Sequence, residues 1–527
     1  GRDATWLAIG ASIFASNIGS EHLIGLAGAG ASSGMAMAHW EIQGWMILIL
    51  GWVFVPFYSR SMVYTMPEFL ERRYNPQSRT ILSVISLVSY VLTKVAVTVY
   101  AGGLVFQQVF GIKELWGIDF FWIAAIGLVV LTALYTIFGG MKSVLYTSVL
   151  QTPILLLGSL IILVLGFKEL GGWDEMMRVC GAVTVNDYGD TMTNLIRSND
   201  DANFPWLGAL IGSAIIGFWY WCTDQFIVQR VLSGKNEKEA RRGTIFGAYL
   251  KLLPVFLFLI PGMIAFALHQ KYIGAGGEGF LPMLANGTAN ADAAFPTLVA
   301  KLLPAGVKGL VVCGILAALM SSLASLFNSS AMLFTIDFYK RFRPETPEKK
   351  LVGIGQIATV VIVILGILWI PIMRSVGDVL YTYLQDVQSV LAPGIAAAFL
   401  LGICWKRTSA QGGMWGLIAG MIIGLTRLGA KVYYSNAGEV ADSTFKYLFY
   451  DMNWLFFCGW MFLFCIIVVI VVSLATEAPT AEKIQGLVFG TATKEQKAST
   501  RASWNHWDII HTVIILAITG AFYWYFW

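Results

Sequence analysis

Runs of about 20 apolar residues, separated by short polar segments, recur along the whole chain. A run of that length is what a helix needs to cross about 30 Å of hydrocarbon. The pattern therefore predicts an all-α, polytopic membrane protein with about 13 transmembrane helices. The expected spans are 4-33, 42-59, 77-110, 119-138, 148-167, 206-230, 243-268, 306-338, 351-373, 377-402, 411-430, 448-476 and 508-526.

Composition agrees with a membrane protein, and the distribution of charge predicts the orientation of the chain in the membrane. The chain is 57% hydrophobic and 13% charged, which is outside the usage of soluble globular proteins. Alternate loops hold most of the 35 Lys and Arg residues, and basic loops are retained on the cytoplasmic side. We therefore expect a cytoplasmic N-terminus and an outer Trp527. The first span follows Asp3 directly at full length, which is not typical of a cleaved signal.

Several classes of function are disfavoured. The net charge of +4 is spread over separate short loops, so nucleic acid is not an expected partner. The six Cys show no disulfide or zinc spacing and are interpreted as structural. No loop is long enough for a catalytic domain, and the five His form no shared constellation, so an enzyme is not expected.

The first span is interrupted by polar and small residues. It reads ASNIGSEHLIGLAGAG over 15-30 and carries Asn17, Glu21 and His22 among four glycines. A helix break frees backbone carbonyls, which are tolerated at membrane depth only beside protein or a water-filled cavity. Broken helices at the midplane are where secondary transporters bind ions and substrates. Close helix packing through small residues is the alternative.

A second break is expected five spans later if the fold is an inverted repeat. There the sequence reads GSAIIGFWYWCTDQFIVQR over 212-230. Gly212, Gly217, Asp224 and Gln225 interrupt an aromatic-rich span at the corresponding position. The two interruptions together favour a transporter.

A cation site is predicted beside the first break. Ala318, Ser321 and Ser322 are spaced i, i+3 and i+4, so they share one helix face. Two hydroxyls and a carbonyl there would face the loosened carbonyls of Ala15 and Ile18. Five neutral oxygens suit Na+, a hard cation. Spacing alone leaves ordinary packing of small residues as an alternative.

Charged residues inside spans mark the polar interior, because each costs about 2.5 to 3.5 kcal/mol at a helix centre. For Lys251, both cavity lining and a buried ion pair are open interpretations. The charged residues inside spans are Glu21, Glu41, Lys94, Asp224, Lys251 and Asp386.

The segments ASNIGSEHLIGLAG, TMPEFLERRY, LYTIFGGMKSVLYTSVLQT, FWYWCTDQFIVQR, YLKLLP and MSSLASLFNSSAMLFTIDFY resemble, in order, the sodium/glucose cotransporters of the solute:sodium symporter family. The resemblance implies a LeuT-type fold in a single transport domain over 1-527. Residues 1-167 and 206-402 would be inverted five-helix repeats, and 411-527 peripheral helices. Family members usually have one further N-terminal helix, and the chain is expected to begin at the first core helix.

The resemblance also assigns roles to residues. The implied sodium ligands are the carbonyls of Ala15, Ile18 and Ala318 and the hydroxyls of Ser321 and Ser322. The implied substrate-binding and gating residues are His22, Glu41, Lys251 and Gln385 for sugar contact, Tyr220 as the inner gate with Trp221 beside it, and Leu26, Trp40 and Tyr381 as the outer gate. Such a mixed set offers donors, acceptors and aromatic faces to a sugar.

The chain departs from the family pattern at three positions. Gly44 and Gly217 stand where a polar sugar contact is common, so the substrate identity is open. Ser148 stands where Asp is common, near a second sodium site that a serine, here Ser325, would complete. The loss of that charge predicts one Na+ per sugar.

We therefore expect a Na+-coupled symporter that imports a glucose-like or galactose-like monosaccharide by alternating access. A carrier of another polyol such as myo-inositol is the alternative, as is a sensor that keeps the symporter fold. The expected partners are the sugar, the sodium ion and the lipid bilayer. The expected location is the plasma membrane, or the inner membrane of a bacterium. The sequence does not predict an oligomeric state.

Overall fold

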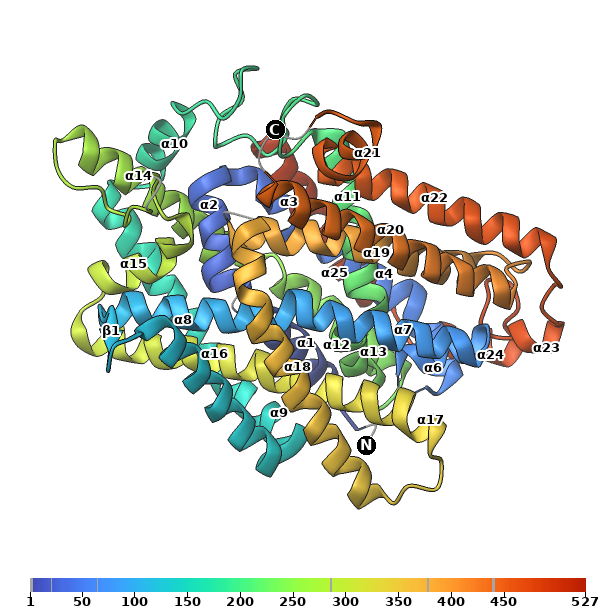
Figure 1. Cartoon of the computed structure of the whole chain (residues 1–527). Helices are drawn as coiled ribbons and strands as arrows, with labels where there is room; N and C mark the ends of the chain where they lie inside the picture. Colours follow the sequence, from blue (N-terminus) through green and yellow to red (C-terminus); the bar gives the residue numbers. More distant parts are fainter. Residues whose placement is uncertain (1–2, 20, 64, 285–286, 377–378, 438–440) are drawn as a thin grey trace.

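The chain is helical almost throughout, as expected for a protein whose backbone must satisfy its own hydrogen bonds in lipid. The computed structural model describes residues 3–19, 21–63, 65–284, 287–376, 379–437 and 441–527. Within helices it leaves out the side chains of residues 135, 137–152 and 374–376. Figure 1 shows helices crossing and packing in several directions around a common centre.

The first third of the chain forms a series of helices and one small hairpin of two antiparallel strands, β1 (Glu114–Leu115) and β2 (Ile118–Asp119). The helices are α1 (Trp6–Asn17), η1 (Glu21–Leu26), α2 (Ala27–Ser33), η2 (Gly34–Met37), α3 (Ala38–Glu41), α4 (Gly44–Ile49), η3 (Leu50–Phe54), α5 (Val55–Ser61), α6 (Met66–Arg73), α7 (Pro76–Ser89), η4 (Tyr90–Val95), α8 (Ala96–Phe110) and α9 (Phe120–Leu170).

The middle of the chain contains the second interrupted span and, after it, the three long helices α16, α18 and α19. Its helices are α10 (Trp173–Gly181), α11 (Trp206–Gly217), η5 (Phe218–Thr223), α12 (Gln225–Leu232), α13 (Glu237–Leu250), η6 (Val255–Leu259), α14 (Ile260–Gly274), η7 (Ala291–Ala293), α15 (Ala294–Leu302), α16 (Ala305–Met332), η8 (Leu333–Tyr339), α17 (Lys340–Phe342), α18 (Glu348–Val376) and α19 (Leu380–Cys404).

The last part of the chain is formed by further long apolar helices and the short segments between them. These are α20 (Ala410–Asn436), α21 (Thr444–Lys446), η9 (Tyr447–Asp451), α22 (Trp454–Ala475), α23 (Ala481–Ile484), α24 (Lys494–Ala502) and α25 (His506–Tyr525).

The predicted spans correspond to the observed helices. Among the described residues, 11 helices are long and apolar enough to cross a membrane, and Trp6–Asn17 and Phe120–Leu134 are two shorter apolar segments. Together they cover the thirteen expected spans. One detail differs, because the expected spans 119-138 and 148-167 lie in the continuous helix α9 rather than in two helices. Pro153 lies within α9 and does not end it.

Both predicted helix breaks are confirmed. The first helix, α1, ends at Asn17, and Ile18 has an extended backbone (φ −83°, ψ 96°) before η1 begins at Glu21. In the second span, η5 ends at Thr223, and Asp224 is extended (φ −74°, ψ 127°) before α12. The side chain of Asp224 then accepts a hydrogen bond from Phe226 N and caps α12.

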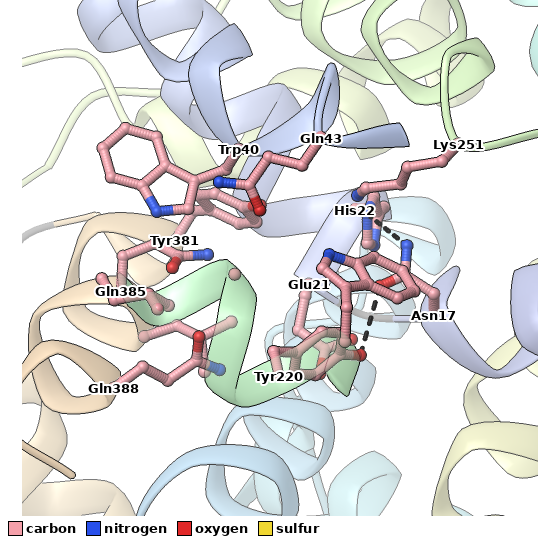
Figure 2. Close-up of a pocket in the computed structure, with 14 residues that line it drawn as sticks. Asn17, Glu21, His22, Trp40, Gln43, Tyr220, Lys251, Tyr381, Gln385 and Gln388 are labelled. Carbon is pink, nitrogen blue, oxygen red and sulfur yellow. Dashed lines mark hydrogen bonds between the residues drawn. The ribbon is translucent and has the colours of Figure 1, made fainter. Parts of the chain in front are cut away.

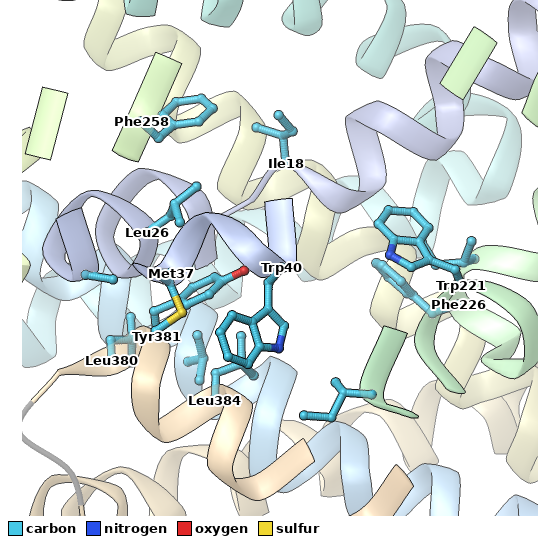
Figure 3. Packing of buried hydrophobic residues seen from close by; sticks show 14 of the residues in the cluster. Ile18, Leu26, Met37, Trp40, Trp221, Phe226, Phe258, Leu380, Tyr381 and Leu384 are labelled. Carbon is cyan, nitrogen blue, oxygen red and sulfur yellow. The ribbon is translucent and has the colours of Figure 1, made fainter. Parts of the chain in front are cut away.

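Burial separates the centre of the molecule from its rim. The most apolar windows of Glu237–Gly274 and Leu380–Cys404 are both 83% buried, whereas that of His506–Tyr525 is only 17% buried. Helix α16 packs along α9, α1 along α13, and α19 against α20 and α22. Figure 3 shows Ile18, Leu26, Trp40 and Tyr381 gathered in the core around the first interrupted span. The breaks therefore lie in the interior, where protein groups can reach the freed backbone.

One buried carboxylate lies outside the spans, in the segment between α14 and α16. The carboxylate of Asp292 accepts a hydrogen bond from Leu380 N at 3.2 Å, at the start of α19. Its Oδ1 lies 2.5 Å from the point where a Cβ at Gly28 would stand, so only glycine leaves room for it. Burial raises the pKa of Asp292 to about 7.

This raised pKa predicts a pH-dependent stability. The folded state binds a proton at Asp292 between the ordinary carboxyl pKa and about 7, so stability falls as pH rises through that window. The slope from this group is up to about 1.4 kcal/mol per pH unit. In detergent, the melting temperature of Asp292→Asn should therefore fall less between pH 5 and pH 7.5 than that of the wild type. Asp187→Asn, at an exposed position, serves as the control, and parallel curves for the wild type and Asp292→Asn would contradict the prediction.

Candidate functional site

A pocket lies between the two helix breaks. It is lined from the end of α1 and η1, from α3 and the turn after it, from α11 and η5, from the residue after α13, and from α19, and its cavity volume is about 40 Å³. Figure 2 shows side chains from these separate segments pointing toward one another. The lining residues are Asn17, Glu21, His22, Trp40, Gln43, Ile216, Gly217, Tyr220, Trp221, Lys251, Tyr381, Leu384, Gln385 and Gln388.

Glu41 is the centre of a polar network directly behind this lining. It is fully buried, and its Oε2 accepts hydrogen bonds from Lys251 Nζ at 2.6 Å and His22 Nε2 at 3.1 Å. Its Oε1 accepts a hydrogen bond from the Tyr381 hydroxyl. A buried carboxylate is expensive unless it is paired and fully hydrogen-bonded. The three donors therefore hold the first span, the turn after α13 and α19 together at one point.

Lys251 combines the two interpretations that the sequence left open. Its ammonium group forms a buried ion pair with Glu41, and its side chain also lines the pocket. The ammonium also lies 5.3 Å from the centre of the Trp221 ring, within range of a cation–π contact. Asp386, another charged residue of the spans, pairs with Lys431 instead and does not line this pocket.

A second buried ion pair supports the break in the sixth expected span. Lys94 Nζ lies 3.0 Å from Asp224 Oδ2, and the Tyr90 hydroxyl donates to Asp224 Oδ1 at 2.8 Å. The same ammonium lies 3.6 Å from the ring centre of Phe226 and 4.8 Å from that of Tyr220. Because Asp224 also caps α12, this pair fixes both the break and the aromatic side chains above it.

Tyr220 connects the two breaks directly. Its hydroxyl donates a hydrogen bond to Asn17 Oδ1 at 3.2 Å. Its ring meets that of Trp221 edge to face at 4.9 Å between centroids. Of the other predicted gate residues, Trp40 and Tyr381 line the pocket, whereas Leu26 is fully buried in the core and does not line it.

Three buried polar atoms of the pocket have no hydrogen-bond partner among the described residues. They are Trp40 Nε1, Gln385 Oε1 and His22 Nδ1. The indole nitrogen is a donor, the amide oxygen is an acceptor, and the imidazole nitrogen takes either role according to its protonation. Unpaired buried polar groups are costly, so these atoms are ready for a ligand that both donates and accepts.

Sequence reasoning missed Gln43, which explains one departure from the family pattern. Gln43 Nε2 donates to Ser213 O at 2.7 Å, and the side chain lines the pocket. A Cβ at position 217 would lie 2.4 Å from Gln43 Oε1, so Gly217 makes room for this amide. The polar group absent at Gly217 is thus replaced from the opposite wall. Gly44 serves packing instead, since a Cβ there would lie 2.8 Å from Ala248 O.

The sequence also assigned no role to Gln388, a second amide on α19 that lines the pocket one turn from Gln385. The spacing of these two glutamines on one apolar helix was the signal that could have found it.

One of the predicted sodium ligands, Ser322, lies against the first break. Ala318, Ser321 and Ser322 are all buried on one face of α16. A Cβ at Gly19 would lie 2.4 Å from Ser322 Oγ, an atom without a partner among the described residues. Helix α1 has already ended here, and the adjacent Ile18 is extended. An unpaired hydroxyl oxygen this close to the end of α1 is available to a small cation. Ser325 is buried on the same helix, and Ser148 lies outside the described side chains.

Comparison with known proteins identifies the family. The profile of the sodium:solute symporter family matches residues 1–420. The chain belongs to this family. Human sodium/myo-inositol cotransporter 2 is 36% identical over 504 residues, covering 93% of this chain and 74% of that protein. Sheep sodium/glucose cotransporter 1 is 39% identical over 495 residues, covering 90% of this chain and 74% of that protein.

A solved structure shows the same fold. A Na+-coupled sialic acid symporter, in a substrate-bound outward-open state, superimposes with a TM-score of 0.69 at 22% identity, covering 91% of this chain and 92% of that one. As a sodium:solute symporter, the protein is a multi-pass membrane transporter that uses Na+ as its coupling ion, rather than an enzyme. The expected family, the LeuT-type fold and sodium coupling are confirmed. The individual ligand residues stay predictions.

Proposed function

We propose that this symporter carries a monosaccharide of the glucose or galactose type, with myo-inositol as the second candidate. The observation that carries the proposal is the set of unpaired polar atoms in the pocket, Trp40 Nε1, Gln385 Oε1 and His22 Nδ1. A polyhydroxylated ligand both donates and accepts through each hydroxyl, so it can satisfy all three. The names of the relatives, which are sugar and polyol cotransporters, favour the same class.

The pocket residues are given roles within this proposal. His22, Lys251 and Gln385 contact hydroxyls, and Glu41 orients His22 and Lys251 from behind. Trp221 offers an aromatic face for the C–H face of the ring. Tyr220 closes the inner side through its hydrogen bond to Asn17, and Trp40, Tyr381 and Leu26 close the outer side.

Transport follows from alternating exposure of this pocket. Sodium binds the carbonyls of Ala15, Ile18 and Ala318 and the hydroxyls of Ser321 and Ser322, which bridges the first span and α16. Bound sodium then favours the arrangement that accepts sugar from outside. On the inner side, Arg79 pairs with buried Asp337 at 2.6 Å, and Thr65 donates to the same carboxylate at 3.0 Å. This contact between α7 and η8 must separate for inward release.

The membrane that holds the protein, the side of its N-terminus and its division into repeats are also proposed. We place the protein in the plasma membrane, or in the inner membrane of a bacterium, with the N-terminus of the chain in the cytoplasm. The division into repeats 1-167 and 206-402 with peripheral helices over 411-527 is likewise proposed. It is supported by the two helix breaks, which fall at corresponding places in the two repeats.

A transport assay tests the proposal. Purified protein in proteoliposomes is given labelled glucose, galactose or myo-inositol with an inward sodium gradient and, in parallel, with choline in place of sodium. We expect sodium-dependent uptake and counterflow of at least one of the three. Binding of a sugar without flux would instead support the sensor alternative. Absence of sodium-dependent uptake for all three compounds would refute the substrate class.

Gln385→Glu should change sugar affinity while leaving sodium affinity nearly unchanged. The amide donates and accepts, whereas the carboxylate only accepts. Loss of one hydrogen bond to a substrate hydroxyl corresponds to about 0.5 to 1.5 kcal/mol, or roughly a 2- to 13-fold rise in half-saturating sugar. Uptake measured against sugar and then against sodium separates the two effects. An unchanged half-saturation for every sugar tested would place Gln385 outside the binding site.

A further inference from the structure

Glu21 lies between the pocket and the predicted sodium site. It lines the pocket, and its Oε2 lies 3.1 Å from the point where a Cβ at Gly19 would stand. Ser322 Oγ lies 2.4 Å from the same point. Because position 19 has no side chain, a carboxylate oxygen and an unpaired hydroxyl oxygen both approach its backbone and lie near each other.

Within the apolar helices, Glu21 differs from three other acidic side chains in its partners. Glu41 pairs with Lys251, Asp224 with Lys94, and Asp337 with Arg79. For Glu21, no Lys, Arg or His nitrogen lies within 4.0 Å among the residues that the structure describes. Within a membrane span, an acidic group without a basic partner normally faces an ion pathway or a polar cavity.

We propose that Glu21 supplies the negative charge of the sodium site, with one Na+ held between its carboxylate and the Ser322 hydroxyl, which lie near each other beside Gly19. This inference rests on the proposed sodium site at Ser322 and adds a charged ligand to a set of neutral oxygens. A carboxylate and a hydroxyl are both ligands that hard cations prefer. A cation between the two oxygens would also satisfy Ser322 Oγ.

The position of Glu21 gives a physical route for coupling. The same side chain lines the sugar pocket and approaches Ser322 at Gly19, so a sodium ion bound there would fix a carboxylate of the sugar pocket. Sodium binding would thereby hold the Glu21 side chain in one position in the pocket. It would also raise the fraction of protein molecules in the conformation that binds sugar. Because the charge of one carboxylate offsets one cation, the arrangement also agrees with a single coupled Na+.

The test measures sodium binding and sugar uptake on the same variants. The half-saturating sodium concentration is measured in two ways. The first is the rise in melting temperature of detergent-purified protein as sodium replaces choline at constant ionic strength. The second is sugar uptake into proteoliposomes as a function of sodium concentration. We expect Glu21→Gln to raise half-saturating sodium about tenfold or more in both assays, and Glu21→Asp to recover part of the loss. Gly19→Ala, whose Cβ would push Ser322 Oγ and Glu21 Oε2 away from their present positions, should also weaken sodium binding. Glu175→Gln, on the outer helix α10, is the matched control.

The outcomes separate this inference from the proposed site on which it rests. If Ser322→Ala leaves half-saturating sodium unchanged, the proposed sodium site is wrong. If Ser322→Ala weakens sodium binding and Glu21→Gln does not, only the role of Glu21 is overturned. A Glu21→Gln variant that changes half-saturating sugar at saturating sodium, with sodium binding intact, would make Glu21 a sugar residue and also overturn the inference.

Discussion

Sugar uptake by the Lys251→Ala variant is expected to be lost, because Lys251 lines the pocket and positions Glu41. Removing one partner of a buried ion pair also costs about 3 to 5 kcal/mol of folding stability. Lys251 Nζ is bound to Glu41 Oε2 at 2.6 Å, and Glu41 is fully buried. Without the ammonium group, the carboxylate keeps only His22 and Tyr381 as donors, and the pocket loses a donor to the substrate.

Two companion variants make this result interpretable. Lys238→Ala changes an exposed lysine on α13, the helix that leads to Lys251, and should transport like the wild type. The double variant Lys251→Ala with Glu41→Gln removes the orphaned charge, so it should recover stability without recovering uptake. Size-exclusion chromatography and melting temperature report folding, and labelled sugar uptake reports function. A folded Lys251→Ala protein with normal uptake would contradict the proposed role.

The second large effect concerns accumulation, for which we predict one Na+ per sugar. The potential contributes about 2.3 kcal/mol per charge at 100 mV. A tenfold sodium gradient adds about 1.4 kcal/mol. One ion then supports roughly 500-fold accumulation of sugar, and two ions would support about the square of that. The prediction rests on the neutral Ser148 and on the one carboxylate that approaches Gly19 among the described residues, that of Glu21.

Reversal potentials in proteoliposomes at several imposed sodium and sugar gradients measure this ratio directly. The variant Ser148→Asp tests the cause, since it returns the charge at the position where the family commonly has it. A ratio that increases in this variant would attribute the single ion to Ser148. A measured ratio of two in the wild type would refute the prediction and require another residue to supply the second charge.

The spans and the two breaks could be predicted from the sequence because each depends on local composition. A bilayer imposes length and hydrophobicity on every crossing segment independently of its neighbours. The breaks at Asn17 and Asp224 are likewise local, since small and polar residues interrupt apolar helices at both places. The face shared by Ala318, Ser321 and Ser322 followed from helical spacing alone. In contrast, the sequence did not predict that two expected spans form the single helix α9, because helix boundaries carry weak local signals.

The partners across the pocket were decided only by the tertiary structure. Spacing indicated that Lys251 is functional or paired, but not that Glu41, 210 positions away, is its partner. The same holds for Gln43 filling the space beside Gly217, and for Ser322 facing Gly19. These contacts join helices that are distant in sequence, and their geometry depends on how those helices pack. The sequence by itself thus determined which segments cross the membrane and where they break, whereas packing decided which polar groups meet and which are left open for a ligand.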